Sequence, residues 1–272
     1  MSERIVAFAT ARIPSRPLAV TRIGVGFASL FEALQLLPLR HATFDPARFH
    51  LSYGLPAIPP EASLVPFGLW IAGALGLAIG AFTRGSAWLA ALGHGLFFFA
   101  DRQNFTNHGY LILVLVTLIA LADSGAALSL DARRRGSRAN VARWPAELLR
   151  LQLAIVYVFA ALTKLNADWL SGAFLDFMVA PQSLGWRVLH LAPGSLQIAA
   201  VLVAVMEGLL GVLFAIARGR RAAIATGVAL HLGILAVFPA NVDLLLFALS
   251  CLSVYPLLEP LARGAEASRV SA

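Results

Sequence analysis

Apolar residues fill most of the chain in eight long runs, and short polar stretches separate them. Each run is close to the roughly 17–25 residues that a helix needs to cross a bilayer. We therefore predict an all-α integral membrane protein, a bundle of about eight transmembrane helices. The expected helices are 18–39, 64–82, 86–100, 108–129, 146–164, 195–217, 222–238 and 242–258. The last two are short and closely spaced, so a re-entrant pair is the alternative there.

Composition supports a membrane protein, because 59% of the residues are apolar, 13% are charged and the mean hydropathy is +0.80. The net charge of +7 comes mainly from arginines between the apolar runs. This arrangement is typical of topology signals and argues against nucleic-acid binding. With the N-terminus inside, sixteen basic residues fall on the inner side and five on the outer side. Both termini are then cytoplasmic, and the abundance of alanine and arginine favours a bacterial inner membrane.

We expect three regions: a cytoplasmic N-terminal segment 1–17, a transmembrane domain 18–258 and a cytoplasmic tail 259–272 that looks disordered. Two long connections, 40–63 and 165–194, fall on the outer side. The second is rich in aromatic residues, so we expect it to lie along the membrane interface. Elaborated loops often carry function, which favours a site on the outer side. The glycines of run 64–82 (Gly73, Gly76 and Gly80) have the spacing of helix-packing positions.

Ionisable groups inside a bilayer are costly, so each one is a candidate for function. The candidates are Glu32, His94, His108, Lys164, Glu207, His231 and Asp243. Lys164 is the only lysine of the chain and ends the run 146–164, with Tyr157 two turns earlier on the same face. A buried amine can be neutral near pH 7 and act as a base, which arginine cannot do. The alternative is a lysine that extends to the outer interface.

Asn107 is a natural N-cap for the run that begins at His108. An interfacial histidine in a capping turn is the structural alternative to a functional His108. Glu32 and Glu207 could equally form interhelical pairs with an arginine or histidine, such as Arg22 or His231. No metal-ligand spacing, phosphate-binding glycine loop or nucleophile elbow occurs, so we predict no metal.

The stretch from Gln152 to Gly172 resembles the signature of vitamin K-dependent gamma-carboxylase, which ends in Lys-Lys-Leu-Asp-Ala-Asp-Trp. The wider group is the horizontally transferred transmembrane (HTTM) domain family. Three further segments resemble the family in the right order, and the resemblance covers most of the chain. They are Arg22–Phe27, the Asn-His-Gly-Tyr-Leu of 107–111, and His231-Leu232 with Phe238-Pro239. Two positions depart from the family, since Thr163 replaces the first lysine and Asn166 the first aspartate.

The resemblance implies a lysine base that deprotonates a reduced quinone (vitamin K-like), with O2 and CO2 as co-reactants. Lys164 corresponds to that lysine, His108 to a histidine that assists it, and His231 to another functional histidine. The supporting residues would be Asn107, Tyr157, Asp168, Trp169, His231, Glu207 and Glu32. Little chain follows the last expected helix, so we expect a lipid-soluble small molecule as substrate rather than a peptide.

Three hypotheses follow. The first is a quinone-linked membrane enzyme. The second is a non-enzymatic protein that binds lipid or quinone, or that anchors a membrane or periplasmic partner protein among the membrane lipids. A transporter ranks last, because no internal repeat is visible.

Overall fold

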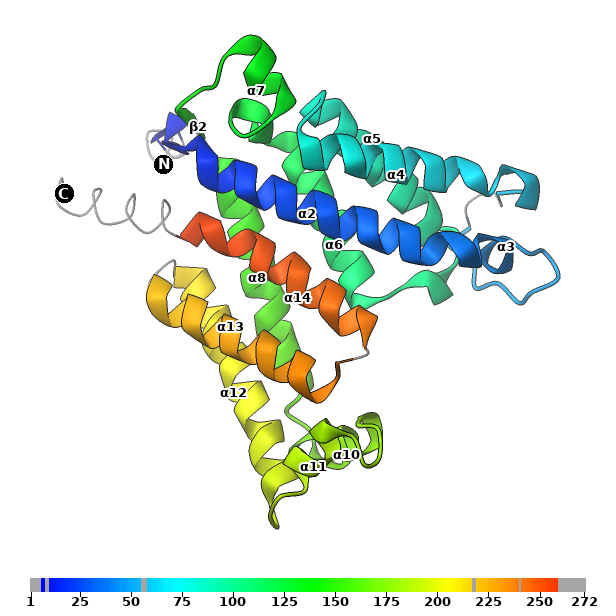
Figure 1. Cartoon of the computed structure of the whole chain (residues 1–272), viewed down its shortest axis with the longest axis vertical. Coiled ribbons are helices and arrows are strands. Elements are labelled where there is room, and N and C mark those ends of the chain that lie inside the picture. The colour runs from blue at the N-terminus through cyan, green and yellow to red at the C-terminus, as the bar shows by residue number, and fades with distance from the viewer. Residues whose placement is uncertain (1–5, 8–9, 55–57, 217–218, 240, 259–272) are drawn as a thin grey trace. The chain divides into compact units, whose positions relative to one another are not determined.

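The computed structural model describes residues 6–7, 10–54, 58–216, 219–239 and 241–258, and most of these residues are helical (Figure 1). The long helices are α2 (Ser15–Leu36), α4 (Leu64–Ile79), α5 (Thr83–Phe98), α6 (Asn107–Leu121), α8 (Trp144–Thr163), α12 (Ser195–Ile216), α13 (Arg220–Val237) and α14 (Val242–Val254). The short ones are α3 (Arg40–Thr43), α7 (Leu130–Arg135), α9 (Ala167–Leu170), α10 (Ala173–Met178) and α11 (Leu184–Leu189). Five 3-10 turns are η1 (Leu37–Leu39), η2 (Pro60–Ala62), η3 (Arg102–Asn104), η4 (Ser124–Ala126) and η5 (Tyr255–Leu257). The predicted all-α class is confirmed, and one long helix lies in each predicted run.

Five helical segments of the described chain are long and apolar enough to cross a membrane, by length and composition. They are Ser15–Thr43, Pro60–Ile79, Trp144–Thr163, Ser195–Ile216 and Arg220–Val237. Of the other three long helices, α6 with 15 residues and α14 with 13 residues are shorter than expected. The helix predicted to reach residue 129 ends at Leu121, because the chain turns extended at Ala122 and then forms η4. The 16 residues of α5 would span only about 24 Å, less than the roughly 30 Å of a bilayer core.

A small β-ribbon joins two segments that the sequence pattern did not mark as strands. β1 (Arg12–Pro14) pairs antiparallel with β2 (Asn140–Ala142), so that Ile13 lies opposite Val141. Each strand has only three residues, too few for an alternating pattern to be recognised. The segment 1–17 thus contains a strand and the start of α2, whereas the expected tail 259–272 lies outside the described residues.

The described residues divide into two compact units, the first formed by those up to residue 149 together with 249–258 and the second by those of 150–248. In the first unit, α4 packs on α5 and α2, and α5 also packs on α6. A side chain at Gly73 would collide with the backbone of α5 at Ala90. The glycine therefore lets the two helices approach closely, as its spacing predicts. Gly80 ends α4 with φ +72°, a left-handed conformation that suits glycine.

In the second unit, the connection 165–194 folds into α9, α10 and α11 rather than a free loop. Leu175, Val179 and Leu189 of this connection are buried against Ala200 of α12. Its aromatic residues make specific contacts, since the rings of Trp186 and His190 stack at 4.3 Å between centroids. The apolar character of the connection is explained in part by this packing.

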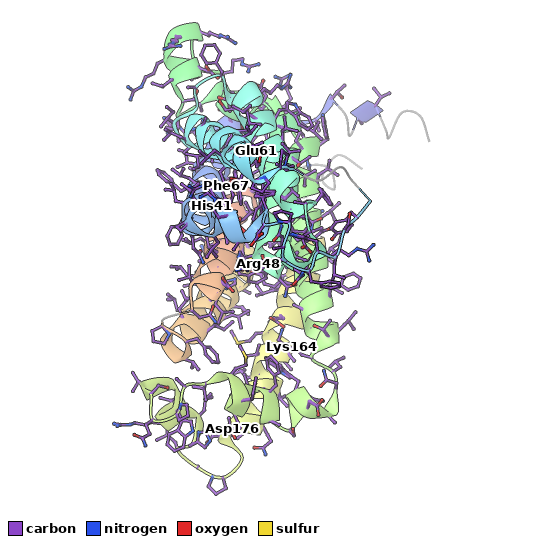
Figure 2. All side chains as sticks on the ribbon, turned by 90° about the vertical axis from the view of Figure 1, so that its right-hand side faces the viewer. His41, Arg48, Glu61, Phe67, Lys164 and Asp176 are labelled. Atoms are coloured by element: carbon purple, nitrogen blue, oxygen red, sulfur yellow. The ribbon has the colours of Figure 1, made fainter. Side chains whose placement is uncertain are left out.

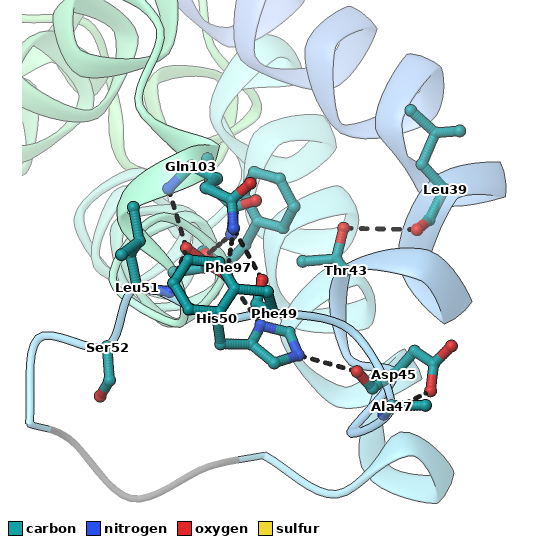
Figure 3. A network of polar contacts seen from close by, with 12 residues as sticks. Leu39, Thr43, Asp45, Ala47, Phe49, His50, Leu51, Ser52, Phe97 and Gln103 are labelled. Carbon is teal, nitrogen blue, oxygen red and sulfur yellow. Dashed lines mark hydrogen bonds and ion pairs between the residues drawn. The ribbon is translucent and has the colours of Figure 1, made fainter.

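A polar network in the first unit ties the connection 40–63 to η3 (Figure 3). The His50 ring contacts two acceptors, the Asp45 carbonyl at 2.8 Å and the Asp101 carboxylate at 2.7 Å. These two bonds raise the pKa of His50 above 6.5. Burial acts to raise the pKa of Asp101. Bonds from Gln103 N, His50 and Leu51 N outweigh that effect and lower it.

Candidate functional site

Lys164 forms a close ion pair with Glu207 in the second unit. Its Nζ lies 2.7 Å from Glu207 Oε2 and donates to Oε1 at 3.0 Å. It also donates to the Ala160 carbonyl at 3.2 Å. The Lys164 side chain is 17% exposed and that of Glu207 only 7%. The lysine is thus held against α12 rather than extended freely to an interface.

Local structure after α8 explains why Lys164 occupies this position. The helix ends at Thr163, and Asn166 begins a new short helix by accepting a hydrogen bond from Trp169 N at 2.9 Å. Asparagine and aspartate are equally good N-caps, so the departure of Asn166 from the family pattern leaves this turn intact. Trp169 then turns back towards α12 and donates from Nε1 to the Ala200 carbonyl at 2.9 Å. Its ring lies 4.9 Å from Lys164 Nζ, within cation–π range. Figure 2 labels Lys164 near the α9–α11 segment, which also carries Asp176.

An open apolar groove of about 380 Å³ lies between α8 and α12. Several of its lining residues are close in sequence to Lys164 and Glu207. Its lining residues share an aliphatic or glycine character and are Val158, Ala161, Leu162, Leu165, Leu170, Val201, Ala204, Val205, Gly208 and Val212. Leu162 and Leu165 flank Lys164 in sequence, and Gly208 follows Glu207. Sequence neighbours of the charged pair therefore line a groove that has no polar side chain in its lining.

Tyr157 and His231 form a second polar contact in this unit. The Tyr157 hydroxyl lies 2.9 Å from His231 Nε2, and the two side chains are buried. This bond joins α8 to α13. The sequence predicted Tyr157 as a neighbour of Lys164. In the structure, the residue that the Tyr157 hydroxyl contacts is His231.

Glu32 and His108 belong to a buried cluster in the first unit, together with His94. The Glu32 carboxylate lies 3.6 Å from His108 Nε2 and 3.9 Å from His94 Nε2. The His94 ring stacks on Trp70 at 3.9 Å between centroids, and Trp70 Nε1 donates to Ser29 Oγ at 2.8 Å. The sequence predicted that Glu32 pairs with an arginine or a histidine on another helix. In the structure its partners are histidines, on α5 and α6. Glu207 pairs with Lys164 instead of the suggested His231.

One expectation for a polar residue needs correction. Thr106, not Asn107, is the N-cap of α6, because its side chain accepts a hydrogen bond from Gly109 N at 3.1 Å. Asn107 is the first helical residue and is exposed. Asp168 also lies exposed in the first turn of α9, where a carboxylate favours the helix dipole.

Contacts among seven of the nine predicted site residues define three groups: Lys164 with Glu207 and Trp169, Tyr157 with His231, and Glu32 with His108. Sequence reasoning gave no role to Trp70, whose stacking on His94 depends on two helices meeting. Within the described residues, no three histidine, cysteine or acidic side chains are grouped to hold a metal ion.

Comparison with known protein families identifies the family to which the chain belongs. No solved structure matches the chain. The model of the HTTM domain matches residues 11–259, which includes β1, all eight long helices and every residue of the three groups. The chain is a member of the HTTM domain family.

Proposed function

We propose that this chain is a membrane-embedded enzyme that uses Lys164 as a base on a lipid-soluble, quinone-like substrate. The observation that carries the proposal is the Lys164–Glu207 ion pair, whose sequence neighbours Leu165 and Gly208 line an apolar groove. Family membership is consistent with a vitamin K-dependent carboxylase-like domain.

The groove suits an apolar ligand with a polar end. Its volume of about 380 Å³ is in the range of small-molecule sites. Several lining side chains are strongly exposed, including Leu165 at 63% and Val205 at 60%. A molecule dissolved in the bilayer could enter from the side, with its ring hydroxyl towards Lys164 and its tail along the aliphatic lining.

The ion pair gives Lys164 a route to its basic form. When the proton moves from Nζ to Glu207 Oε1 along the 3.0 Å hydrogen bond, the amine becomes neutral and can accept a proton from an acidic hydroxyl. An apolar surrounding favours this neutral state of the pair. A bound quinol would supply the redox chemistry, with O2 as its oxidant and CO2 as a separate co-reactant. This chain would supply orientation and proton transfer.

His108 is the second residue that we propose for catalysis, on the strength of its correspondence in the family. Its ring lies beside Glu32 within the first unit, and a carboxylate can orient an imidazole and stabilise its protonated form.

We further propose eight spans with both termini cytoplasmic in a bacterial inner membrane. Basic-residue asymmetry and the eight long helices support this topology.

The test replaces Lys164 with arginine, which keeps the charge and removes the proton-accepting amine. We would first identify quinones that co-purify with the protein by mass spectrometry. We would then follow turnover of a reduced naphthoquinone with an isoprenoid tail under O2 and CO2. The expected result is lost turnover in K164R with retained quinone binding. Arg187→Lys is the matched control, because it exchanges the same residue types in the same unit. Undiminished turnover in K164R would refute the base.

A non-enzymatic lipid- or quinone-binding role, or an anchor for a partner protein, is the second candidate. The groove itself favours it, because no polar side chain lines it. In this case the ion pair serves packing, K164R retains its ligand, and neither variant nor wild type turns over the quinol. A co-purifying partner protein would support the anchoring role.

A further inference from the structure

Arg22 in α2 is a buried guanidinium whose hydrogen bonds are incomplete. Its exposed fraction is 0%, and its Nη2 donates to the Leu128 carbonyl at 2.6 Å. Its Nε and Nη1 have no hydrogen-bond partner among the described residues. No carboxylate of that part of the chain lies within ion-pair distance of Arg22. A buried charge with no carboxylate in direct contact is costly, so a further anion nearby would stabilise this arrangement.

Asp131 is the acidic residue whose charge acts on Arg22, but its carboxylate is already hydrogen-bonded to other groups. Its carboxylate accepts hydrogen bonds from Phe82 N at 3.0 Å, Thr83 N at 2.8 Å and Thr83 Oγ1 at 2.7 Å. These bonds satisfy the start of α5. They hold the pKa of Asp131 low despite its partial burial, which acts to raise it. Asp131 therefore acts on Arg22 only through space.

An open hollow of about 680 Å³ lies against the same backbone segment that Arg22 contacts. Its lining combines aliphatic, hydroxyl and arginine side chains: Ile79, Leu128, Ser129, Leu130, Ala132, Arg133 and Ser137. Leu128 lines the hollow and also binds Arg22 through its carbonyl, with a strained φ of +48°. The position that a Gly80 side chain would take is filled by Arg22 Nη1 and Ser129. Arg22 thus lies directly behind the wall of the hollow.

Positive side chains outnumber the acidic ones around the hollow. Arg133, Arg134 and Arg135 of α7 are exposed, and Asp123 is paired with Arg138. The hollow also lies at the end of a candidate span, because Ile79 is the last residue of Pro60–Ile79. Lipid headgroups lie at that depth, with acyl chains alongside the helix.

We propose that this hollow binds the phosphate of an anionic lipid headgroup. Arg133 contacts the phosphate, the hydroxyl groups of Ser129 and Ser137 line its surroundings, and Arg22 supplies buried positive charge from behind. Ile79 and Leu130 contact the start of an acyl chain. This site is independent of the Lys164 groove, and it would persist if the proposed enzyme activity were wrong.

The test compares lipid retention by native mass spectrometry of the full chain purified in detergent. Phosphatidylglycerol and phosphatidylcholine are added in equal amounts to wild type, Arg133→Gln and Arg84→Gln. Arg84 is the matched control, because it is exposed and does not line the hollow. We expect wild type to retain phosphatidylglycerol preferentially. Arg133→Gln should lower this preference about tenfold, and Arg84→Gln less than about twofold.

Arg22→Met should also lower the preference, with circular dichroism and thermal melting as folding checks. If Arg22→Met fails to fold, the exposed Arg133 variant decides alone. An unchanged preference in Arg133→Gln would overturn the proposal, as would an equal loss in Arg84→Gln. Inorganic phosphate serves as the second probe. A thermal stabilisation by phosphate equal to that by phosphatidylglycerol would assign the hollow to free phosphate and overturn the lipid assignment.

Discussion

Removing one partner of the Lys164–Glu207 pair should destabilise the fold, whereas removing both should cost much less than the sum. We would replace Lys164 with methionine, Glu207 with leucine, and both together. The pair has two close N–O contacts, at 2.7 and 3.0 Å, and Glu207 is 7% exposed. Each single variant leaves one ionisable group of the pair without its partner.

The magnitude follows from the burial of the pair. Losing one partner of a fully buried ion pair costs about 3–5 kcal/mol, and a charge-assisted hydrogen bond contributes about 1.5–3 kcal/mol. Because Lys164 is 17% exposed, water screens part of its charge, and we take the lower ends of those ranges. We expect each single variant to lose about 2–3 kcal/mol, with a coupling energy near 2 kcal/mol.

The assay is equilibrium unfolding in mixed micelles with a denaturing detergent, followed by circular dichroism. Asp168→Asn is the control, because it removes an exposed acid four residues from Lys164 and should change the unfolding free energy by less than about 0.5 kcal/mol. Strictly additive effects in the double variant would refute the coupling and with it the geometry on which the base mechanism depends.

Three further changes test other parts of the structure. His50 has a raised pKa, so the stability that it contributes is full below pH 6.5 and is lost as the pH rises through its folded pKa. His50→Gln should remove this dependence of the melting temperature on pH, while His41→Gln should keep it. Asn166→Ala should cost about 1 kcal/mol through loss of the α9 N-cap, while Asn166→Asp restores it. Gly80→Ala should cost about 2 kcal/mol or more, because φ is +72° and Arg22 fills the space.

Each of these has a clear opposing result. A pH slope that survives in His50→Gln would assign it to another group. Equal melting temperatures for Asn166→Ala and wild type would remove the cap from the description of α9. A Gly80→Ala variant as stable as wild type would mean that Arg22 can move, which would also weaken the anion site behind Leu128.

The sequence by itself determined the places of all eight long helices, because unbroken apolar runs are a local signal. It also singled out Lys164 as the only lysine and indicated the family through the segment that follows it. The ends of helices were harder to predict from the sequence. For example, α6 stops at Leu121 although apolar residues continue, because the backbone becomes extended at Ala122.

Tertiary structure alone decided the partners. Glu207 meets Lys164, Glu32 meets His94 and His108, and Tyr157 meets His231. Each of these contacts joins residues that are distant along the chain. They depend on how helices rotate and pack, and apolar periodicity does not encode helix rotation once nearly every face is apolar. The same reason kept the sequence from showing that Arg22 is buried against Leu128, because that contact arises from packing that no local pattern records.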